Sequence, residues 1–550
     1  MREFQHRDTE AQRDGLLSYL LRAVSLCLCV FVLNGVLYSQ VQSPKNAQTF
    51  ERTLHVAPLT PNGERYVYVP FDVPRGAVRV AVAYDYAREG GANTIDLGVF
   101  DARSDGPGRE VSARGFRGWS GGRRPEFFIS REEATPGYLA GELPAGRWRV
   151  ILGLYKVAPA GVDVKIKISI ETGGRRAGSR TAARPTTRGT EKLLPREWGG
   201  ERKTAGPNLY WFAGDLHMHT VHSDGDWTVP ELAAAAGREG LDFIFVTDHN
   251  TASHHADVEK ANVNSQPPLV MRGEEVTTYG GHANAWGLPA GAFVDFRVRP
   301  GDAATMSEVA ADAHRLGALV SVNHPFALCG GCDWSYGDAV REFDAVEVWN
   351  GEWDATDESA LKLWDGLLQR GLRPTAVASS DSHRAQNPIG HPTTHVAAVE
   401  LSQATLLDSI RRGRAYLTRE PKGLVVDFEA AAGTLDSKEA VGARKGAGEE
   451  IRLTAPGTLV FYVRVGVTPS PVEAMSLVRP YAAVSLVSGG RVIRTWKADQ
   501  LTEVFEVECE RDGYYRLEVR DRDGAMLALT NPVYVRVGTA GAGRVSSRRP

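Results

Sequence analysis

The sequence Asp215-Leu216-His217-Met218-His219-Thr220, continued by Val221-His222-Ser223-Asp224-Gly225, decides how the middle of this chain is interpreted. It follows an apolar run at residues 209–212 that predicts a short buried strand. Because side chains alternate along an extended segment, His217 and His219 are expected to point to the same side. Two imidazoles placed in this way favour a metal ion, and Asp224, in a Ser-Asp-Gly turn, offers a carboxylate. A single H-x-H pair is equally compatible with two ordinary half-buried histidines.

Other strands expected in this region also end in groups suited to metal binding. We expect strands at residues 243–247, 269–275, 318–323, 345–349 and 374–379, and helices at residues 229–240, 306–317, 359–371 and 405–414. Most of these strands lead into one of the groups Asp248-His249-Asn250, Glu274-Glu275, Asn323-His324-Pro325 and Asp381-Ser382-His383, and His282 follows the second group. Alternating strands and helices predict a parallel sheet, open or closed into a barrel, with its chemistry at the C-terminal strand ends. The donors exceed what one tetrahedral ion uses, which predicts a site for two or three ions.

In this order the motifs resemble those of the PHP (polymerase and histidinol phosphatase) superfamily, and most closely the CehA/McbA-type metallohydrolases, over roughly residues 209–420. The resemblance implies a distorted (βα)7 barrel and two or three divalent ions, which would be zinc, manganese or iron. It implies three sets of ligands: His217, His219, Glu275 and Asp381; Glu275, His282 and His324; and Asp224, His249 and His383. Glu275 would bridge the first two ions. Two alternatives stay open, because Glu274 could replace Glu275 and Asn284 could occupy a ligand position.

These ligands predict a hydrolase in which a metal-activated hydroxide attacks a small-molecule substrate. The bond would be a phosphoester, or a carbamate, ester or amide. Asn250 and Arg384 are the candidate substrate-binding residues, and no catalytic protein nucleophile is expected. The G-x-S-x-G pattern at residues 118–122 lacks the strand-to-helix context of a nucleophile elbow. The alternative is a non-catalytic protein that binds a glycan or a surface and keeps a relic barrel.

Strand patterns flank the expected barrel on both sides. Alternating apolar residues predict a β-sandwich at residues 45–172 and a second one at 421–538, with the barrel at 208–420. Residues 173–207 read as a basic Gly/Pro/Arg linker and residues 539–550 as a disordered tail. All candidate ligands fall in the barrel, so we expect residues 209–420 to keep activity without the sandwiches, provided that the truncated barrel stays folded.

The remaining features concern export and partners. Residues 1–39 combine basic residues with an apolar run of about 16 residues, shorter than the roughly 20 of a transmembrane helix, and predict a signal peptide or a signal anchor. The protein is therefore expected to be periplasmic or extracellular. Cys329 and Cys332 are expected to form a tight loop disulfide, since no second cysteine pair accompanies them in a metal-binding pattern. The net charge of -3 argues against nucleic acid as the main partner, and no integral membrane partner is evident.

Overall fold

The computed structural model describes residues 47–60, 63–105, 111–173, 209–262, 267–436, 442–467, 481–497 and 501–538. The expected signal segment, nearly all of the expected linker and the expected tail lie outside these residues. Among the described helices, none is both long enough and apolar enough to span a bilayer.

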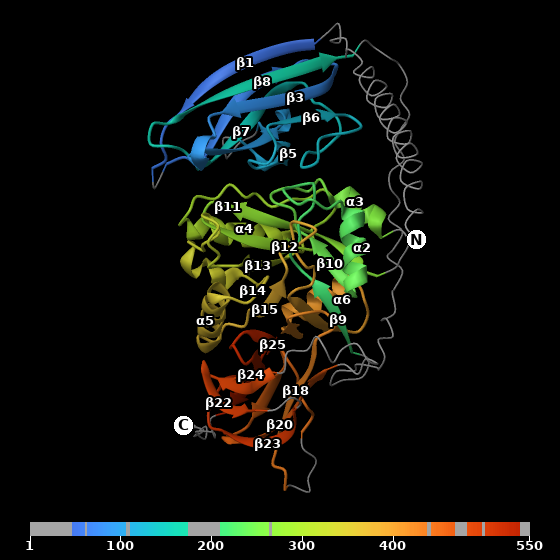
Figure 1. Ribbon diagram of the computed structural model, residues 1–550, viewed down its shortest axis with the longest axis vertical. Coiled ribbons are helices and arrows are strands. Elements are labelled where there is room, and N and C mark those ends of the chain that lie inside the picture. Colours follow the sequence, from blue (N-terminus) through green and yellow to red (C-terminus); the bar gives the residue numbers. More distant parts are fainter. Residues whose placement is uncertain are drawn as a thin grey trace, which may run out of the picture. The chain divides into compact units, whose positions relative to one another are not determined.

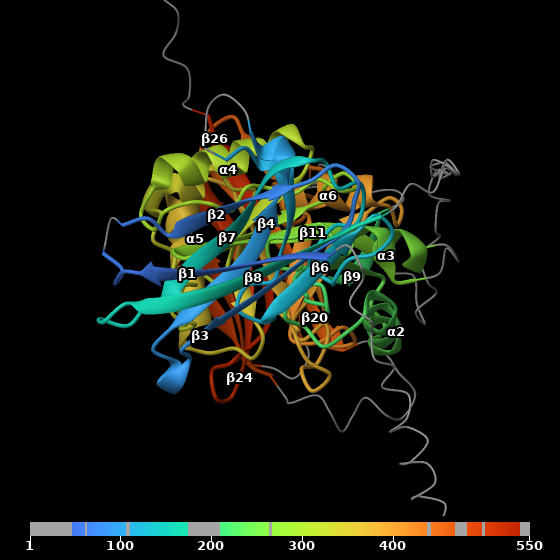
Figure 2. The same ribbon diagram turned by 90° about the horizontal axis from the view of Figure 1, so that it is seen from above.

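Residues before the expected linker form two antiparallel four-stranded sheets (Figures 1 and 2). The strands are β1 (Ala47–Val56), β2 (Tyr66–Val73), β3 (Ala77–Tyr86), β4 (Thr94–Phe100), β5 (Phe116–Trp119), β6 (Glu126–Ser130), β7 (Gly146–Lys156) and β8 (Val162–Thr172). One sheet has the order β1-β8-β3-β6 and the other β2-β7-β4-β5. Along β8, buried and exposed residues alternate, and its buried face shares one apolar core with β4 and β7 of the other sheet. The alternation in sequence therefore produces a two-layer sandwich.

The middle of the chain forms one curved sheet with helices between several of its strands (Figure 1). Its strands are β9 (Tyr210–Asp215), β10 (Phe243–Val246), β11 (Leu269–Thr278), β12 (Gly281–Trp286), β13 (Leu319–Asn323), β14 (Ala345–Asn350), β15 (Thr375–Ser379), β16 (Thr393–Ala398) and β17 (Ala415–Thr418). Its helices are α2 (Val229–Glu239), α3 (His255–Ala261), α4 (Ala303–Arg315), α5 (Ala355–Gln369) and α6 (Gln403–Arg411). The strand order is β15-β14-β13-β12-β11-β10-β9-β16-β17.

This sheet differs from the regular parallel sheet that the sequence predicts. Strand β12 is antiparallel to both β11 and β13, and β16 is antiparallel to both β9 and β17. Only Tyr279 and Gly280 separate β11 from β12, and so short a link forms a hairpin and cannot carry a parallel crossover. The described ladder is also open, so a closed (βα)7 barrel is not shown. Side chains join β15 to β16 instead: the Thr394 hydroxyl accepts a hydrogen bond from Ala378 N and donates one to Ala378 O, at 2.9 and 2.7 Å.

The helices begin and end at local capping signals. Thr228 caps α2, and the Glu231 side chain accepts a hydrogen bond from the Thr228 backbone N–H in return. The helix stops at Gly240, whose φ of 89° suits glycine. Helix α5 begins four residues earlier than the sequence pattern indicates, because Asp354 caps it from outside the apolar stretch.

The last third of the chain continues the middle sheet. Its strands are β18 (Leu424–Ala432), β19 (Glu450–Leu453), β20 (Gly457–Val467), β21 (Tyr481–Ser488), β22 (Arg491–Trp496), β23 (Leu501–Cys509), β24 (Gly513–Asp521), β25 (Met526–Thr530) and β26 (Val533–Val537). Strands β18, β20 and β23 form a separate three-stranded sheet. Strand β25 pairs with β17, so that hydrogen bonding crosses the boundary expected after residue 420. The three-stranded sheet and the strands that continue the middle sheet share one apolar core.

The first sandwich also shares a core with the middle sheet. Phe116 and Trp119 of β5 pack on Phe296, with ring centroids 5.9 and 4.8 Å apart. The Tyr279 hydroxyl, in the β11–β12 hairpin, donates a hydrogen bond of 2.6 Å to Asp96 of β4. The hairpin that carries part of the site is therefore held by residues of the sandwich.

Candidate metal centre

The candidate ligands lie at or just beyond the ends of neighbouring strands. His217 and His219 follow β9 and flank Met218, which pairs in parallel with Ser382 beyond the end of β15. This pairing keeps the segment extended, so both imidazoles point the same way, as the H-x-H spacing predicts. His249 follows β10 and pairs in parallel with Glu275 of β11. The other strand-end residues are His282 in β12, His324 after β13, and Asp381 and His383 after β15.

The Glu275 carboxylate is the centre of the arrangement. Its Oε1 lies 3.2 Å from His217 Nε2, 3.1 Å from His282 Nδ1 and 3.2 Å from His324 Nε2. Its Oε2 lies 2.6 Å from His249 Nδ1 and 3.5 Å from His219 Nε2. A carboxylate in contact with five imidazoles, each from a different turn or strand end except the H-x-H pair, is placed to join ions held on both of its oxygens.

Asp381 is the second carboxylate of the cluster and is partly exposed. Its Oδ1 lies 3.3 Å from His217 Nε2 and 3.1 Å from His219 Nε2. These three residues form one set of donor atoms close enough to share an ion, and Glu275, His282 and His324 form another.

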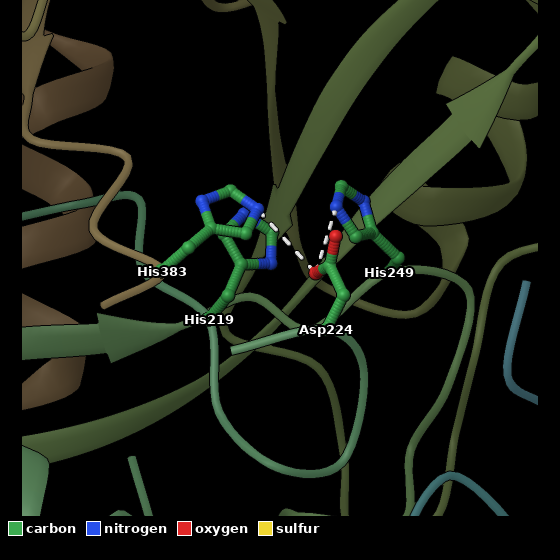
Figure 3. A group of neighbouring side chains, drawn as sticks. All are labelled: His219, Asp224, His249 and His383. Atoms are coloured by element: carbon green, nitrogen blue, oxygen red, sulfur yellow. Dashed lines mark ion pairs between the residues drawn. The ribbon is translucent and has the colours of Figure 1, made fainter. Parts of the chain in front are cut away.

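A third set lies toward the solvent. Asp224 Oδ1 lies 3.4 Å from both His249 Nε2 and His383 Nε2, and His219 completes the group (Figure 3). Figure 3 shows Asp224 between the imidazoles of His383 and His249. Asp224, His249 and His383 are all partly exposed, unlike His219. Asp224 is the most exposed donor of the three sets.

Several buried atoms of these residues lack a hydrogen-bond partner among the described residues. They include His217 Nε2, His219 Nε2, Asp224 Oδ1, Glu275 Oε2 and Asp381 Oδ1. An unpaired buried polar atom costs about 1–3 kcal/mol, so several in one cluster indicate that something absent from the protein chain completes their bonding. Imidazole and carboxylate donors at these separations fit divalent ions such as zinc.

The protonation of these groups follows from burial and mutual charge. Burial alone would raise the pKa of Glu275, but the charges of His217, His249 and His282 outweigh it and hold the pKa well below its usual value. Burial, helped by the charges of His383 and His249, lowers the pKa of His219 to about 4. Glu275 is therefore ionised and His219 neutral near pH 7, which are the states that bind a metal ion.

His383 behaves differently because it faces two carboxylates. Burial lowers its pKa, but the hydrogen bond to Asp224 and the charges of Asp381 and Asp224 outweigh burial and raise the pKa to about 10. An ion that binds His383 must therefore displace a proton near neutral pH.

Backbone conformation adds independent evidence for the site. Among the described residues other than glycine, positive φ occurs at Asn250 (50°), His324 (27°) and Asp381 (51°). All three lie at or beside the strand ends that carry the candidate ligands. Such conformations cost of order 1–3 kcal/mol each and cluster at functional sites.

The structure separates the two adjacent glutamates. Glu275 faces the histidines, whereas the Glu274 carboxylate accepts a hydrogen bond from Val294 N at 2.6 Å on the other face of β11. Burial raises the pKa of Glu274 well above its usual value. Glu274 is therefore not a ligand in this arrangement. Asn284, the other open alternative, lies opposite Glu275 on β12, and its Oδ1 has no hydrogen-bond partner among the described residues.

The two predicted substrate-binding residues lie outside the donor sets. The Asn250 side chain exchanges hydrogen bonds with the backbone of Thr277, as donor at 2.8 Å and as acceptor at 2.8 Å. Its amide therefore positions β11 against the loop of His249. The Arg384 guanidinium is largely exposed and lies 3.9 Å from Asp226.

Two buried carboxylates, Glu347 and Asp248, were assigned no role from the sequence but position a candidate ligand or the loop that follows it. Glu347, in the mainly apolar strand β14, lies 3.1 Å from His217 Nδ1. Asp248 accepts hydrogen bonds from Thr220 N, the Thr220 hydroxyl and the Ser223 hydroxyl, at 2.7, 2.6 and 2.6 Å. The only signal in the sequence was their position. Glu347 lies within a mainly apolar strand, and Asp248 lies just beyond the end of an apolar strand.

The loop after His324 contains the predicted disulfide. Cys329 and Cys332 are bonded to each other, and Cys509 is free and buried in β23. The Cys332 sulfur lies 3.9 Å from His282 Nδ1.

Comparisons with known proteins give partial similarities. No family model matches the chain, and no curated protein matches it. Among solved structures, a two-domain protein from Bacteroides vulgatus, described as containing a predicted PHP-like metal-dependent phosphoesterase, is 17% identical and matches 63% of this chain and 100% of its own, with a TM-score of 0.34. An amidohydrolase from Chromobacterium violaceum is 16% identical, over 33% of this chain and 90% of its own, with a TM-score of 0.25. A periplasmic lysozyme inhibitor from Aeromonas hydrophila is 14% identical, over 24% of this chain and 93% of its own, with a TM-score of 0.14. At such low TM-scores none of these similarities assigns a function to this chain.

Proposed function

We propose that this protein is a metal-dependent hydrolase of the PHP superfamily, of the CehA/McbA type, with two or three divalent ions in the cluster around Glu275. The observation that carries the proposal is the contact of one buried carboxylate with five imidazoles, several of whose donor atoms have no partner within the chain. The ordered motifs that resemble this superfamily support the same reading.

The donor sets suggest which residues hold which ion. His217, His219 and Asp381 would hold the first, and His282 and His324 the second, with Glu275 between them. Asp224, His249 and His383 would hold a third. When bound, the ions would activate a water molecule as nucleophile and take up negative charge from the substrate.

The chain's own residues orient these donors and control access. Glu347 holds His217 through Nδ1, which leaves Nε2 directed at Glu275 and Asp381. His324 and Asp381 are held in their positive-φ conformations at the ends of β13 and β15. The partly exposed set of Asp224, His249 and His383 is the side from which a small-molecule substrate would enter.

Two classes of substrate fit this arrangement. A phosphoester carries extra negative charge, which positively charged side chains would have to balance. Among the candidate site residues, Arg384 is the one basic side chain other than the histidines. Arg384 is already beside Asp226. Arg124 adds a second fixed positive charge nearby, because it donates a hydrogen bond to Val221 O and interacts with Asp224, so these residues fit either class of substrate.

The proposal is tested by reconstitution and turnover. Metal-free protein loaded with zinc, manganese or iron should bind at least two ions per chain by elemental analysis. The loaded protein should hydrolyse at least one of p-nitrophenyl phosphate, p-nitrophenyl acetate or a p-nitrophenyl carbamate, and His324→Ala should lose most of this activity. No more than one bound ion, or equal rates for wild type and His324→Ala, would refute the proposal.

We also infer that the protein is exported, on the basis of the basic and then apolar segment at residues 1–39. Cell fractionation should recover the chain outside the cytoplasm or at the membrane. Accumulation of full-length chain in the cytoplasm would contradict this inference.

A further inference from the structure

The disulfide loop after His324 brings two sulfur atoms to the edge of the donor cluster. The donor atoms of Cys329, Cys332 and His282 all lie within 4.8 Å of one another. Cys329 is exposed, whereas Cys332 is buried beside His282. A reductant in solution therefore reaches one sulfur, while the other sulfur already faces an imidazole.

We propose that this cysteine pair is a redox-controlled metal site. After reduction, Cys329 and Cys332 bind one thiophilic divalent ion, such as zinc or cadmium, together with His282. In the reduction the S–S bond breaks, the pair takes up two electrons and two protons, and a dithiol is oxidised to its own disulfide. The two thiols then lose their protons as the ion binds.

The spacing of the two cysteines suits such an ion. A Cys-x-x-Cys segment is a frequent half-site for zinc, and thiolates select soft ions over manganese or magnesium. Here the intervening residues are Gly330 and Gly331, which leave the loop free of bulky side chains. A histidine as third donor leaves one position for water or a neighbouring carboxylate.

The loop is held by contacts other than the disulfide. The Tyr155 hydroxyl donates a hydrogen bond of 2.6 Å to Cys329 O, and Trp334 N donates one of 2.9 Å to Pro325 O. Neither bond involves a sulfur atom, so opening the disulfide removes no partner from either of them.

The redox state of the cysteine pair then decides which of two sets of metal-binding atoms His282 joins. His282 Nδ1 lies 3.1 Å from Glu275 Oε1 and 3.9 Å from the Cys332 sulfur. One nitrogen lone pair binds one ion. With the disulfide closed, His282 is available to Glu275 and His324, and with the thiols free it joins the sulfur set. This inference concerns ion binding and does not require that the protein be a hydrolase.

The test uses cadmium as the probe on the full-length, metal-free protein. One sample keeps its disulfide, and the other is reduced with dithiothreitol, which is removed under argon before cadmium is added. The reduced sample should show two more titratable thiols, a sulfur-to-cadmium charge-transfer absorption that the oxidised sample lacks, and a changed cadmium stoichiometry. A thiol count that does not rise in the folded protein, or a reduced protein without this absorption, would overturn the proposal.

Matched variants assign the signal. Cys329→Ser/Cys332→Ser keeps the other three cysteines and should lose the redox-dependent absorption, whereas Cys509→Ser should retain it. If the double variant still gains the absorption on reduction, the sulfur donors lie elsewhere and the proposal is wrong. Hydrolysis by the oxidised protein is measured in parallel, so that failure of this site and failure of the hydrolase assignment give different results.

Discussion

The Glu347 carboxylate connects His217 to His324, two histidines that follow different strands. Its Oε1 lies 3.1 Å from His217 Nδ1, and its Oε2 accepts a hydrogen bond of 2.9 Å from the His324 backbone N–H. Glu347 and His217 are almost completely buried. A carboxylate behind a histidine fixes which ring nitrogen carries the proton and how the ring is turned. Glu347 is therefore a positioning residue for two of the donor sets at once.

Replacing Glu347 should weaken ion binding without removing a proposed ligand. We expect Glu347→Ala to lower metal affinity by a factor of about 10–100, the range typical of such outer carboxylates. The metal affinity of Glu347→Gln should fall between those of Glu347→Ala and wild type, because an amide has one oxygen that accepts hydrogen bonds whereas a carboxylate has two. Affinity is measured by competition with a chelator, and the exposed Glu352→Ala is the control. A folded Glu347→Ala protein with wild-type affinity would contradict the role.

The neighbours Glu274 and Glu275 should respond oppositely to the same substitution. Glu275→Gln should lose at least one ion, because the bridge contributes to two donor sets and its charge balances several imidazoles. Glu274→Gln should keep its ions, since it faces Val294 on the other side of β11. Metal content per chain after dialysis distinguishes the two variants. If Glu274→Gln loses metal and Glu275→Gln keeps it, the register of β11 is wrong.

Glu274→Gln should also change how the stability of the protein depends on pH. Burial raises the pKa of Glu274 well above its unfolded value, so its stabilising effect is complete at low pH and is lost as the pH rises through the folded pKa. Glu274→Gln removes this loss and should raise Tm relative to wild type most at high pH. A Tm difference that does not grow with pH would show that Glu274 is ionised in the folded state.

Asp96, which joins the first sandwich to Tyr279 of the middle sheet, should make the stability of the protein pH-dependent. Burial raises the pKa of Asp96 from 3.8 to about 7, although the hydrogen bond from Tyr279 opposes the shift. The folded state therefore holds this proton more tightly than the unfolded state, and the resulting stability is complete below 3.8 and lost as the pH rises through about 7. Asp96→Asn still accepts the hydrogen bond from Tyr279 but does not titrate. The Tm of Asp96→Asn minus the Tm of wild type, measured on metal-free protein, should be larger at about pH 8 than at about pH 5. The same Tm difference at both pH values would contradict the raised pKa of Asp96.

The middle sheet should not fold alone, so the condition under which residues 209–420 are expected to be active without the sandwiches is not met. Removing the first sandwich exposes Phe296, which packs on Phe116 and Trp119, and each buried side chain of this kind contributes about 1.5–3 kcal/mol. Removing the last third also takes away β25, the partner of β17. Since a domain is stable by only about 5–15 kcal/mol, losing both should abolish cooperative unfolding of residues 209–420. Calorimetry of that fragment against the full chain is the test, and a sharp transition with bound metal would refute this expectation.

The candidate ligands could be named from the sequence because their recognition depends on local chemistry. A histidine or carboxylate at the end of an apolar strand is recognisable wherever the strand is placed, and the H-x-H spacing sets the direction of His217 and His219 through the backbone alone. The alternation in β8 likewise determines a half-buried strand without reference to its partner. The motifs therefore predicted the members of the cluster from local pattern and from resemblance.

Other properties were decided only by tertiary structure, because they depend on contacts between residues far apart in the chain. Glu274 and Glu275 are chemically identical, and only the pairing of β11 with β10 and β12 turns Glu275 toward the histidines. Glu347 lies 130 residues from His217, so no local pattern reveals their contact. The antiparallel β12 and β16 and the core shared with the first sandwich arise in the same way, from partners that local propensity does not identify.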